Sequence, residues 1–296
     1  MTGCPMSIMQ NDDDTCFGGI VHGNHSSLTY NSYLMVDQLK ELQVCQSDPA
    51  HHDEPLFIII HQTYELWFKL IIHELDLVID LMRQDKPRRA NHFMKRAVAI
   101  MRILVQQIHI LETMSPRDFL AFRHKLNPAS GFQSSQFREI EFLGGLKDLR
   151  LLEHFKGDAS AYANLTRRYH EPSLQDVFYD LLVRHGFDLP RLNPQQEKDS
   201  PDLASTYEET RIQSLTRLYD DESKDSHDMH DLHDLAESFI DFDELIGLWR
   251  VNHVTVVERI IGFRRGTGGS EGVGYLRSTL HKKCFADLWN LRSALK

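Results

Sequence analysis

His253 places a titratable imidazole on an otherwise apolar helix face. Residues 237–263 contain no proline, and their apolar side chains recur at helical spacing. At about 100° per residue, several of them fall within roughly 40° of His253. These are Phe239, Phe242, Ile246, Trp249, Val257 and Ile260. An unpaired imidazole there costs on the order of 1–3 kcal/mol. His253 is therefore either a hydrogen-bonded core histidine, which spacing alone favours, or a ligand of a metal or haem iron.

Two further side chains lie at the edges of apolar helix faces. His61 follows Phe57 by one helical turn, so it could present a hydrogen-bonding group to an enclosed ligand or simply lie at a boundary. Arg123 follows Phe119 by four residues, and its guanidinium suits bidentate capture of a carboxylate. A surface salt bridge is the alternative for Arg123.

Two other motifs look like a phosphate-binding loop and a metal site, but their details do not match either. The glycine-rich loop at 266–274 follows a helix and lacks a GK[ST] ending, so it is either a close-fitting lid or a flexible connector, not a phosphate loop. His227, His230 and His233 alternate with aspartates at a spacing of three. Their charged neighbours favour a solvated acidic helix end over a metal site.

Composition excludes several classes of protein. The 296 residues carry a net charge of −10, without a basic stripe, which argues against nucleic-acid binding. No apolar run is long enough to span a membrane, and the N-terminus does not resemble a secretory signal. The four cysteines, Cys4, Cys16, Cys45 and Cys284, form no paired motif and indicate reduced thiols in a cytoplasmic protein.

The elements that position these residues are predicted to be helices only, because no convincing alternating strand is present. Residues 1–26 are expected to form a mobile arm, and 27–296 one all-α, bundle-like domain whose 190–235 region is a flexible excursion. A short helix and a structured loop are expected over 119–135. Longer helices are predicted at 30–44, 56–82, 89–113, 136–150, 173–185, 205–220, 237–263 and 275–295.

Four long blocks of the sequence resemble the tryptophan 2,3-dioxygenase family, across about residues 28–296. They are LTYNSYLMVDQL, HHDEPLFIIIHQTYELWFKLIIHEL, FRHKLNPASGFQSSQFREIEFLGG and LWRVNHVTVVERIIGFRRGTGGSEGVGYLRSTL. The resemblance implies an all-α homotetramer that encloses haem b and uses O₂ to cleave the indole C2=C3 bond of L-tryptophan. The product would be N-formylkynurenine, the first step of tryptophan catabolism by the kynurenine pathway.

The resemblance also implies roles for individual residues. His253 would be the axial ligand of the haem iron, and His61 would accept a hydrogen bond from the indole N–H, with Phe57 packed on the indole. Arg123 would hold the substrate carboxylate, and Thr267 would lie near its ammonium and carboxylate groups. Further positions match the pocket lining and an N-terminal segment that reaches into a neighbouring subunit's pocket. The lining positions are Phe119, Leu126 and Ser130, the last beside the cofactor, and the N-terminal ones are Tyr30, Tyr33 and Leu34.

Two alternatives stay open, and departures from the family pattern support the first of them. Phe119 stands where bacterial members usually have Tyr, and Asn31-Ser32 replaces a common Gly-Gly or Gly-Asp. A relative of the same fold in secondary metabolism could instead insert one oxygen atom into a tryptophan derivative, giving an oxindole or hydroxylated product. A non-enzymatic haem sensor would need His253, but not His61, Arg123 and Thr267 together.

Overall fold

The structure is a computed structural model that describes residues 16–17, 20–21, 28–220, 227–268 and 272–295. Contacts within the chain divide it into two units, Met1–Val44 and Cys45–Lys296, and each is described by itself. The helices of the larger unit confirm the all-α class. The boundary expected at residue 26 stays a prediction.

The smaller unit contains two short strands and two short helices. β1 (Cys16–Phe17) pairs antiparallel with β2 (Ile20–Val21) within the segment expected to be a mobile arm, and these short strands leave the all-α class unchanged. The helix predicted at 30–44 is two pieces, α1 (Tyr30–Leu34) and α2 (Val36–Lys40). The break falls at Met35, whose φ of 52° places it in the left-handed region. The rest of the expected mobile arm lies outside the described residues.

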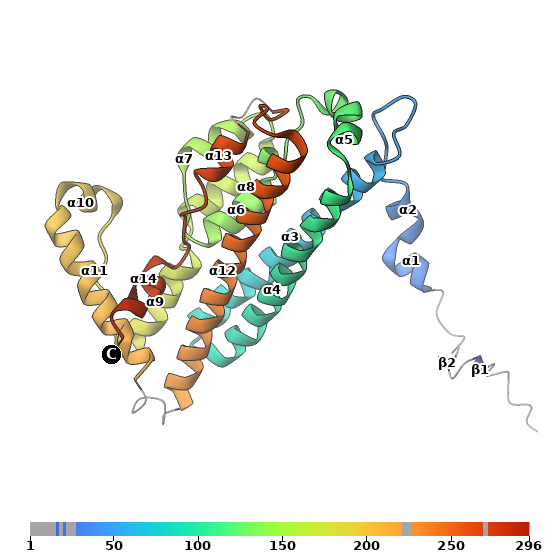
Figure 1. The fold of residues 1–296 in the computed structure, drawn as a ribbon. Helices are drawn as coiled ribbons and strands as arrows, with labels where there is room; N and C mark the ends of the chain where they lie inside the picture. Colours follow the sequence, from blue (N-terminus) through green and yellow to red (C-terminus); the bar gives the residue numbers. More distant parts are fainter. Residues whose placement is uncertain (1–15, 18–19, 22–27, 221–226, 269–271, 296) are drawn as a thin grey trace, which may run out of the picture. The chain divides into compact units, whose positions relative to one another are not determined.

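The larger unit is built from α-helices joined by short 3₁₀ turns (Figure 1). The helices are α3 (Glu54–Arg83), α4 (Pro87–Gln107), α5 (Pro116–Arg123), α6 (Ser135–Leu143), α7 (Leu149–Leu152), α8 (Ala159–His170), α9 (Leu174–Arg184), α10 (Pro194–Asp199), α11 (Pro201–Leu215), α12 (His227–Ile261), α13 (Val273–Arg277) and α14 (Ala286–Asn290). The 3₁₀ turns are Ile108–Thr113, His124–Leu126, Gly131–Gln133, Glu153–Phe155, Thr216–Leu218 and Leu291–Ser293.

Three long helices, α3, α4 and α12, form the centre of this unit, with α4 packed against both of the others (Figure 1). Each buries one apolar stripe spaced by three or four residues. On α3 the stripe comprises Ile60, Tyr64, Phe68, Ile71, Leu75, Val78 and Met82. Pro87 starts α4 because proline at a first helical position removes no intrahelical hydrogen bond. The predicted helices 56–82 and 89–113 are confirmed, with 3₁₀ geometry in the last turn of the second.

Several helix boundaries differ from the predictions. α12 begins at His227, so the His-Asp segment is the first part of this helix. α8 was not predicted. The single helix expected at 275–295 is wrong, because α13 and α14 are separated by a non-helical segment.

The glycine pair Gly144-Gly145 ends α6 early, which divides the helix predicted at 136–150. Gly145 has φ +90°, and a Cβ on Gly144 would lie 2.7 Å from the Cys284 Sγ. Close packing of the C-terminal segment against this corner therefore requires glycine.

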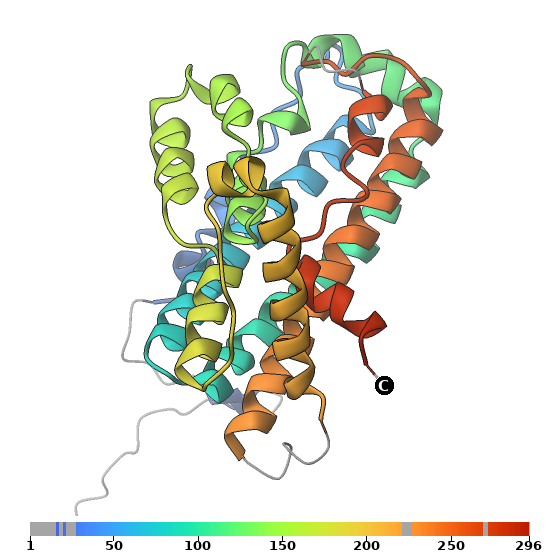
Figure 2. The same cartoon turned by 90° about the vertical axis from the view of Figure 1, so that its left-hand side faces the viewer.

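Most of the predicted excursion at 190–235 is helical. The Arg211 guanidinium on α11 lies 2.6 Å from the Asp287 carboxylate on α14, and both Figure 1 and Figure 2 show these helices side by side. Residues 221–226 lie outside the described residues, and the flexibility of the region stays a prediction.

By length and composition, no single helix in the described part of the chain could cross a membrane. Only the bent pair Pro87–Thr113 and Pro116–Leu126, with an angle of 89° between its members, meets those criteria together.

Asp243 anchors the C-terminal segment to α12. Its side chain is buried, and its carboxylate accepts hydrogen bonds from the backbone N–H groups of Cys284 at 3.0 Å and Phe285 at 3.2 Å. The indole N–H of Trp289 donates to the same carboxylate at 2.9 Å. One buried charge thus satisfies three donors.

We expect Asp243→Ala to lower the free energy of unfolding by about 2–5 kcal/mol, because it leaves buried donors without an acceptor. Asp243→Asn is the matched control, since it retains one oxygen acceptor and should cost less. Urea unfolding followed by circular dichroism measures both. Equal stability of Asp243→Ala and the wild type would contradict the anchoring role.

Candidate functional site

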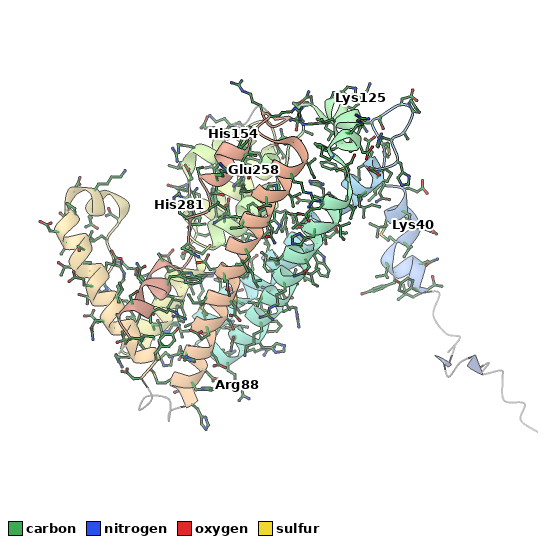
Figure 3. The ribbon with its side chains drawn as sticks, in the orientation of Figure 1. Lys40, Arg88, Lys125, His154, Glu258 and His281 are labelled. Atoms are coloured by element: carbon green, nitrogen blue, oxygen red, sulfur yellow. The ribbon has the colours of Figure 1, made fainter. Side chains whose placement is uncertain are left out.

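A cavity of about 550 Å³ lies at the end of the larger unit where α3, α5, α6, α12 and α13 meet (Figure 1). Figure 3 labels Glu258 on this end of α12 and Lys125 just beyond α5. The volume falls within the range of roughly 300–1,000 Å³ that is common for cofactor and ligand sites. Its lining brings together the site residues predicted from this unit, namely Phe57, His61, Phe119, Arg123, Leu126, Ser130, His253 and Thr267.

The remaining predicted site residues are not among those that line this cavity. Tyr30, Tyr33 and Leu34 lie on α1, in the separately described unit, and all three side chains are exposed.

His61 presents one ring nitrogen to the cavity as an acceptor. Its Nδ1 lies 2.7 Å from the Phe57 carbonyl oxygen, one turn earlier on α3, and can only donate to that oxygen. The neutral ring therefore carries its lone pair on Nε2. Burial lowers the pKa of His61, against the opposing effects of the Phe57 carbonyl and Glu65, which favours this neutral form.

His253 reaches the cavity from α12, and its ring forms no hydrogen bond to any residue that the structure describes. Instead it stacks on Trp249, with centroids 4.9 Å apart and an interplanar angle of 30°. Burial is the main cause that lowers the pKa of His253 to about 4, and the neighbouring His61 and Arg138 side chains add to this lowering. At neutral pH the imidazole is uncharged and its nitrogen lone pair is available to a metal.

The glycine loop packs against the residues between α5 and α6. Thr267 Oγ1 donates to the Ala129 carbonyl oxygen at 2.5 Å, and a Cβ on Gly268 would lie 2.6 Å from the Ser130 Cβ. The Arg123 guanidinium donates to the Arg265 carbonyl oxygen. These contacts favour the lid interpretation over a free connector for the described residues, and 269–271 lie outside them.

The cavity wall contains a buried cluster of ion pairs that the sequence did not predict. Glu141 accepts from Arg138 at 2.5 Å and from Arg250 at 2.8 Å, and all three side chains are buried. The i, i+3 spacing of Arg138 and Glu141 in FREIEF was an available signal, but it is also the spacing of ordinary surface ion pairs.

This wall contains hydrogen-bond donors that lack an acceptor among the described residues. The Nε–H groups of Arg138 and Arg250 are buried, find no acceptor among the residues that the structure describes, and belong to side chains that line the cavity. A buried donor without a partner costs about 1–3 kcal/mol. Two guanidinium groups against one carboxylate also leave an excess positive charge. The wall therefore suits a bound group that carries carboxylates.

No group of three or more His, Cys, Asp or Glu side chains that could hold a metal ion occurs within the described ranges, including the His227–His233 segment. A lone imidazole such as His253 instead suits a metal that already has most of its ligands, as haem iron does. Together with the surplus donors, the residues present fit a haem.

Comparison with known proteins finds relatives that match most of the chain. The model of the family described as tryptophan 2,3-dioxygenase matches residues 14–228 and 204–295. A tryptophan 2,3-dioxygenase of Herpetosiphon aurantiacus is 44% identical over 269 residues, covering 91% of this chain and 99% of that protein. Those of Nocardioides sp. and Myxococcus xanthus are 43% and 40% identical, covering 91% and 94% of this chain and 96% and 93% of their own lengths. The chain therefore belongs to the tryptophan 2,3-dioxygenase family.

Proposed function

We propose that this protein is a haem-dependent dioxygenase that inserts O₂ across the indole C2=C3 bond of L-tryptophan to give N-formylkynurenine. The observation that carries the proposal is the pair of partly buried imidazoles, His61 on α3 and His253 on α12, whose surroundings favour the uncharged form and which line one cavity. The Nδ1 of His61 is hydrogen-bonded, whereas His253 forms no hydrogen bond to a residue that the structure describes. This difference matches a substrate acceptor and a metal ligand.

His253 would hold the iron, and the Nε–H donors of Arg138 and Arg250, which have no acceptor among the described residues, would bind the carboxylates of the haem, with Ser130 at its edge. When bound, the haem supplies the binding and activation of O₂. The protein supplies axial ligation, orientation of the substrate and exclusion of water.

The opposite side of the cavity would position the amino acid. The Nε2 lone pair of His61 accepts a hydrogen bond from the indole N–H, while the rings of Phe57 and Phe119, 5.4 Å apart, provide an apolar wall for the indole. His61 need not remove the proton, since an indole N–H is a very weak acid. Fixing the indole in this way restricts it to a reactive orientation.

Arg123 would bind the substrate carboxylate, with Thr267 and Leu126 beside the amino-acid end of the pocket. Arg123 donates to the Arg265 carbonyl oxygen in the present structure. A carboxylate is a stronger acceptor than a neutral carbonyl because it is charged. The substrate carboxylate can therefore replace the Arg265 carbonyl oxygen as the acceptor of the Arg123 guanidinium.

The assembly would be a cytoplasmic homo-oligomer, a tetramer by analogy with the family. The exposed side chains of Tyr30, Tyr33 and Leu34 would then complete the pocket of a neighbouring subunit. The exposure of these apolar groups supports the proposal, since large exposed apolar patches often mark interfaces.

Incubation of the reduced, haem-loaded protein with L-tryptophan under air should give the near-ultraviolet absorbance of N-formylkynurenine. Mass spectrometry should find two added oxygen atoms. Membership of the family favours this outcome over the one-oxygen alternative. A product with one added oxygen would support that alternative, and no oxygen consumption would support a sensor.

His253→Ala should abolish the haem absorption band of the purified protein, because it removes the nitrogen lone pair that binds iron. His281→Ala, at an exposed position, is the matched control and should load haem normally. Absorbance spectra after addition of haem measure both. A normal five-coordinate spectrum in His253→Ala would refute the ligand assignment.

Arg123→Leu should raise KM for L-tryptophan by roughly ten- to a hundredfold, since a charge-assisted pair is lost. Arg117→Leu replaces an exposed arginine on the same helix and should leave KM unchanged. Steady-state kinetics over a range of tryptophan concentrations measure the two variants. An unaltered KM in Arg123→Leu would remove this residue from the substrate site.

A further inference from the structure

We infer that Trp249 is a positioning residue for His253, and that stacking on its indole ring, rather than a hydrogen bond, fixes the orientation of the iron ligand. This inference rests on the proposed function. The two rings lie one turn apart on α12, 4.9 Å between centroids and 30° between planes. Both side chains line the cavity.

The two histidines of the cavity have the same local design but different restraints. Each follows an aromatic residue by four positions on a long helix, Phe57 before His61 and Trp249 before His253. The His61 ring is held by its hydrogen bond to the Phe57 carbonyl oxygen. No corresponding bond to a described residue is recorded for His253. Metal-ligating histidines usually donate their second ring N–H to a protein acceptor or water, which fixes the ring. At His253 the neighbouring indole face supplies the protein restraint.

Trp249 can act in this way because rings from two other helices hold it. The Phe137 ring of α6 packs on it at 4.8 Å, and the Tyr64 ring of α3 meets it edge-on at 6.1 Å. Tyr64 is itself fixed, since its hydroxyl donates to the Leu104 carbonyl oxygen of α4 at 2.8 Å. The indole cannot turn without displacing these rings, so it gives the imidazole a rigid surface.

This arrangement has a chemical consequence for the ligand. A carboxylate or carbonyl partner would draw the second ring proton away and make the imidazole a stronger electron donor to iron. Stacking restrains rotation without that effect. His253 would therefore bind iron as a neutral imidazole whose direction is set by packing.

The test compares Trp249→Leu, which removes the ring, with Trp249→Phe, which keeps a stacking face but loses the indole N–H. In the haem-loaded ferrous protein, resonance Raman spectroscopy measures the iron–histidine stretching band. We expect this band to shift and broaden in Trp249→Leu and to remain near the wild-type position in Trp249→Phe. Haem transfer to an acceptor protein should be about two- to tenfold faster in Trp249→Leu.

Phe178→Leu is the matched structural control. Phe178 is a buried ring that packs on Phe239 and is not among the residues lining the cavity, so its loss should destabilise the fold without moving the band. Where Trp249→Leu does not fold, Trp249→Met fills the space without a ring. An unchanged band in the ringless variant, or the same shift in Phe178→Leu, would overturn the positioning role. Absence of an iron–histidine band from the wild type would instead refute the proposed function.

Discussion

The site depends on the packing of α4 against both α3 and α12, because this packing allows residues far apart in the sequence to line one cavity. His61 and His253 lie on separate helices, and neither has chemistry of its own that other histidines lack. Their setting makes them distinctive. Enclosure by apolar side chains keeps both rings uncharged at neutral pH, so each retains a lone pair. A solvated histidine would be protonated in part and would bind a metal less well.

Buried charge in the cavity wall is only partly compensated. Glu141 satisfies one side of Arg138 and of Arg250, while the backbone carbonyl oxygen of Lys282 accepts a further hydrogen bond from Arg250 at 3.0 Å. The Nε–H groups of both arginines find no acceptor among the described residues. A buried ion pair that is incompletely satisfied adds little to stability. This arrangement is better explained by an anionic group that completes it than by a contribution to the core.

Helical periodicity predicted the long central helices because each buries a single stripe whose spacing is set by the helix itself. The C-terminal region was predicted less well. Residues 275–295 have helical composition, but Asp243 accepts the backbone N–H groups of Cys284 and Phe285 and so favours a non-helical path there. Such a long-range hydrogen bond leaves no periodic signal. The break at Met35 in the first predicted helix likewise has no proline or glycine that would signal it in the sequence.

The site residues show the same division between local and long-range information. Spacing placed His253 on an apolar face, yet that pattern alone favoured a hydrogen-bonded core histidine. Only the resemblance of the long sequence blocks predicted a ligand, and the structure then added that His253 forms no hydrogen bond to a described residue. The role inferred for Trp249 is harder still to predict. An aromatic residue four positions before a histidine is common on a buried helix face, and only the rings of Phe137 and Tyr64, from two other helices, turn it into a fixed surface. Sequence spacing can therefore indicate a candidate ligand, whereas the contacts that fix the orientation of its ring arise from tertiary packing.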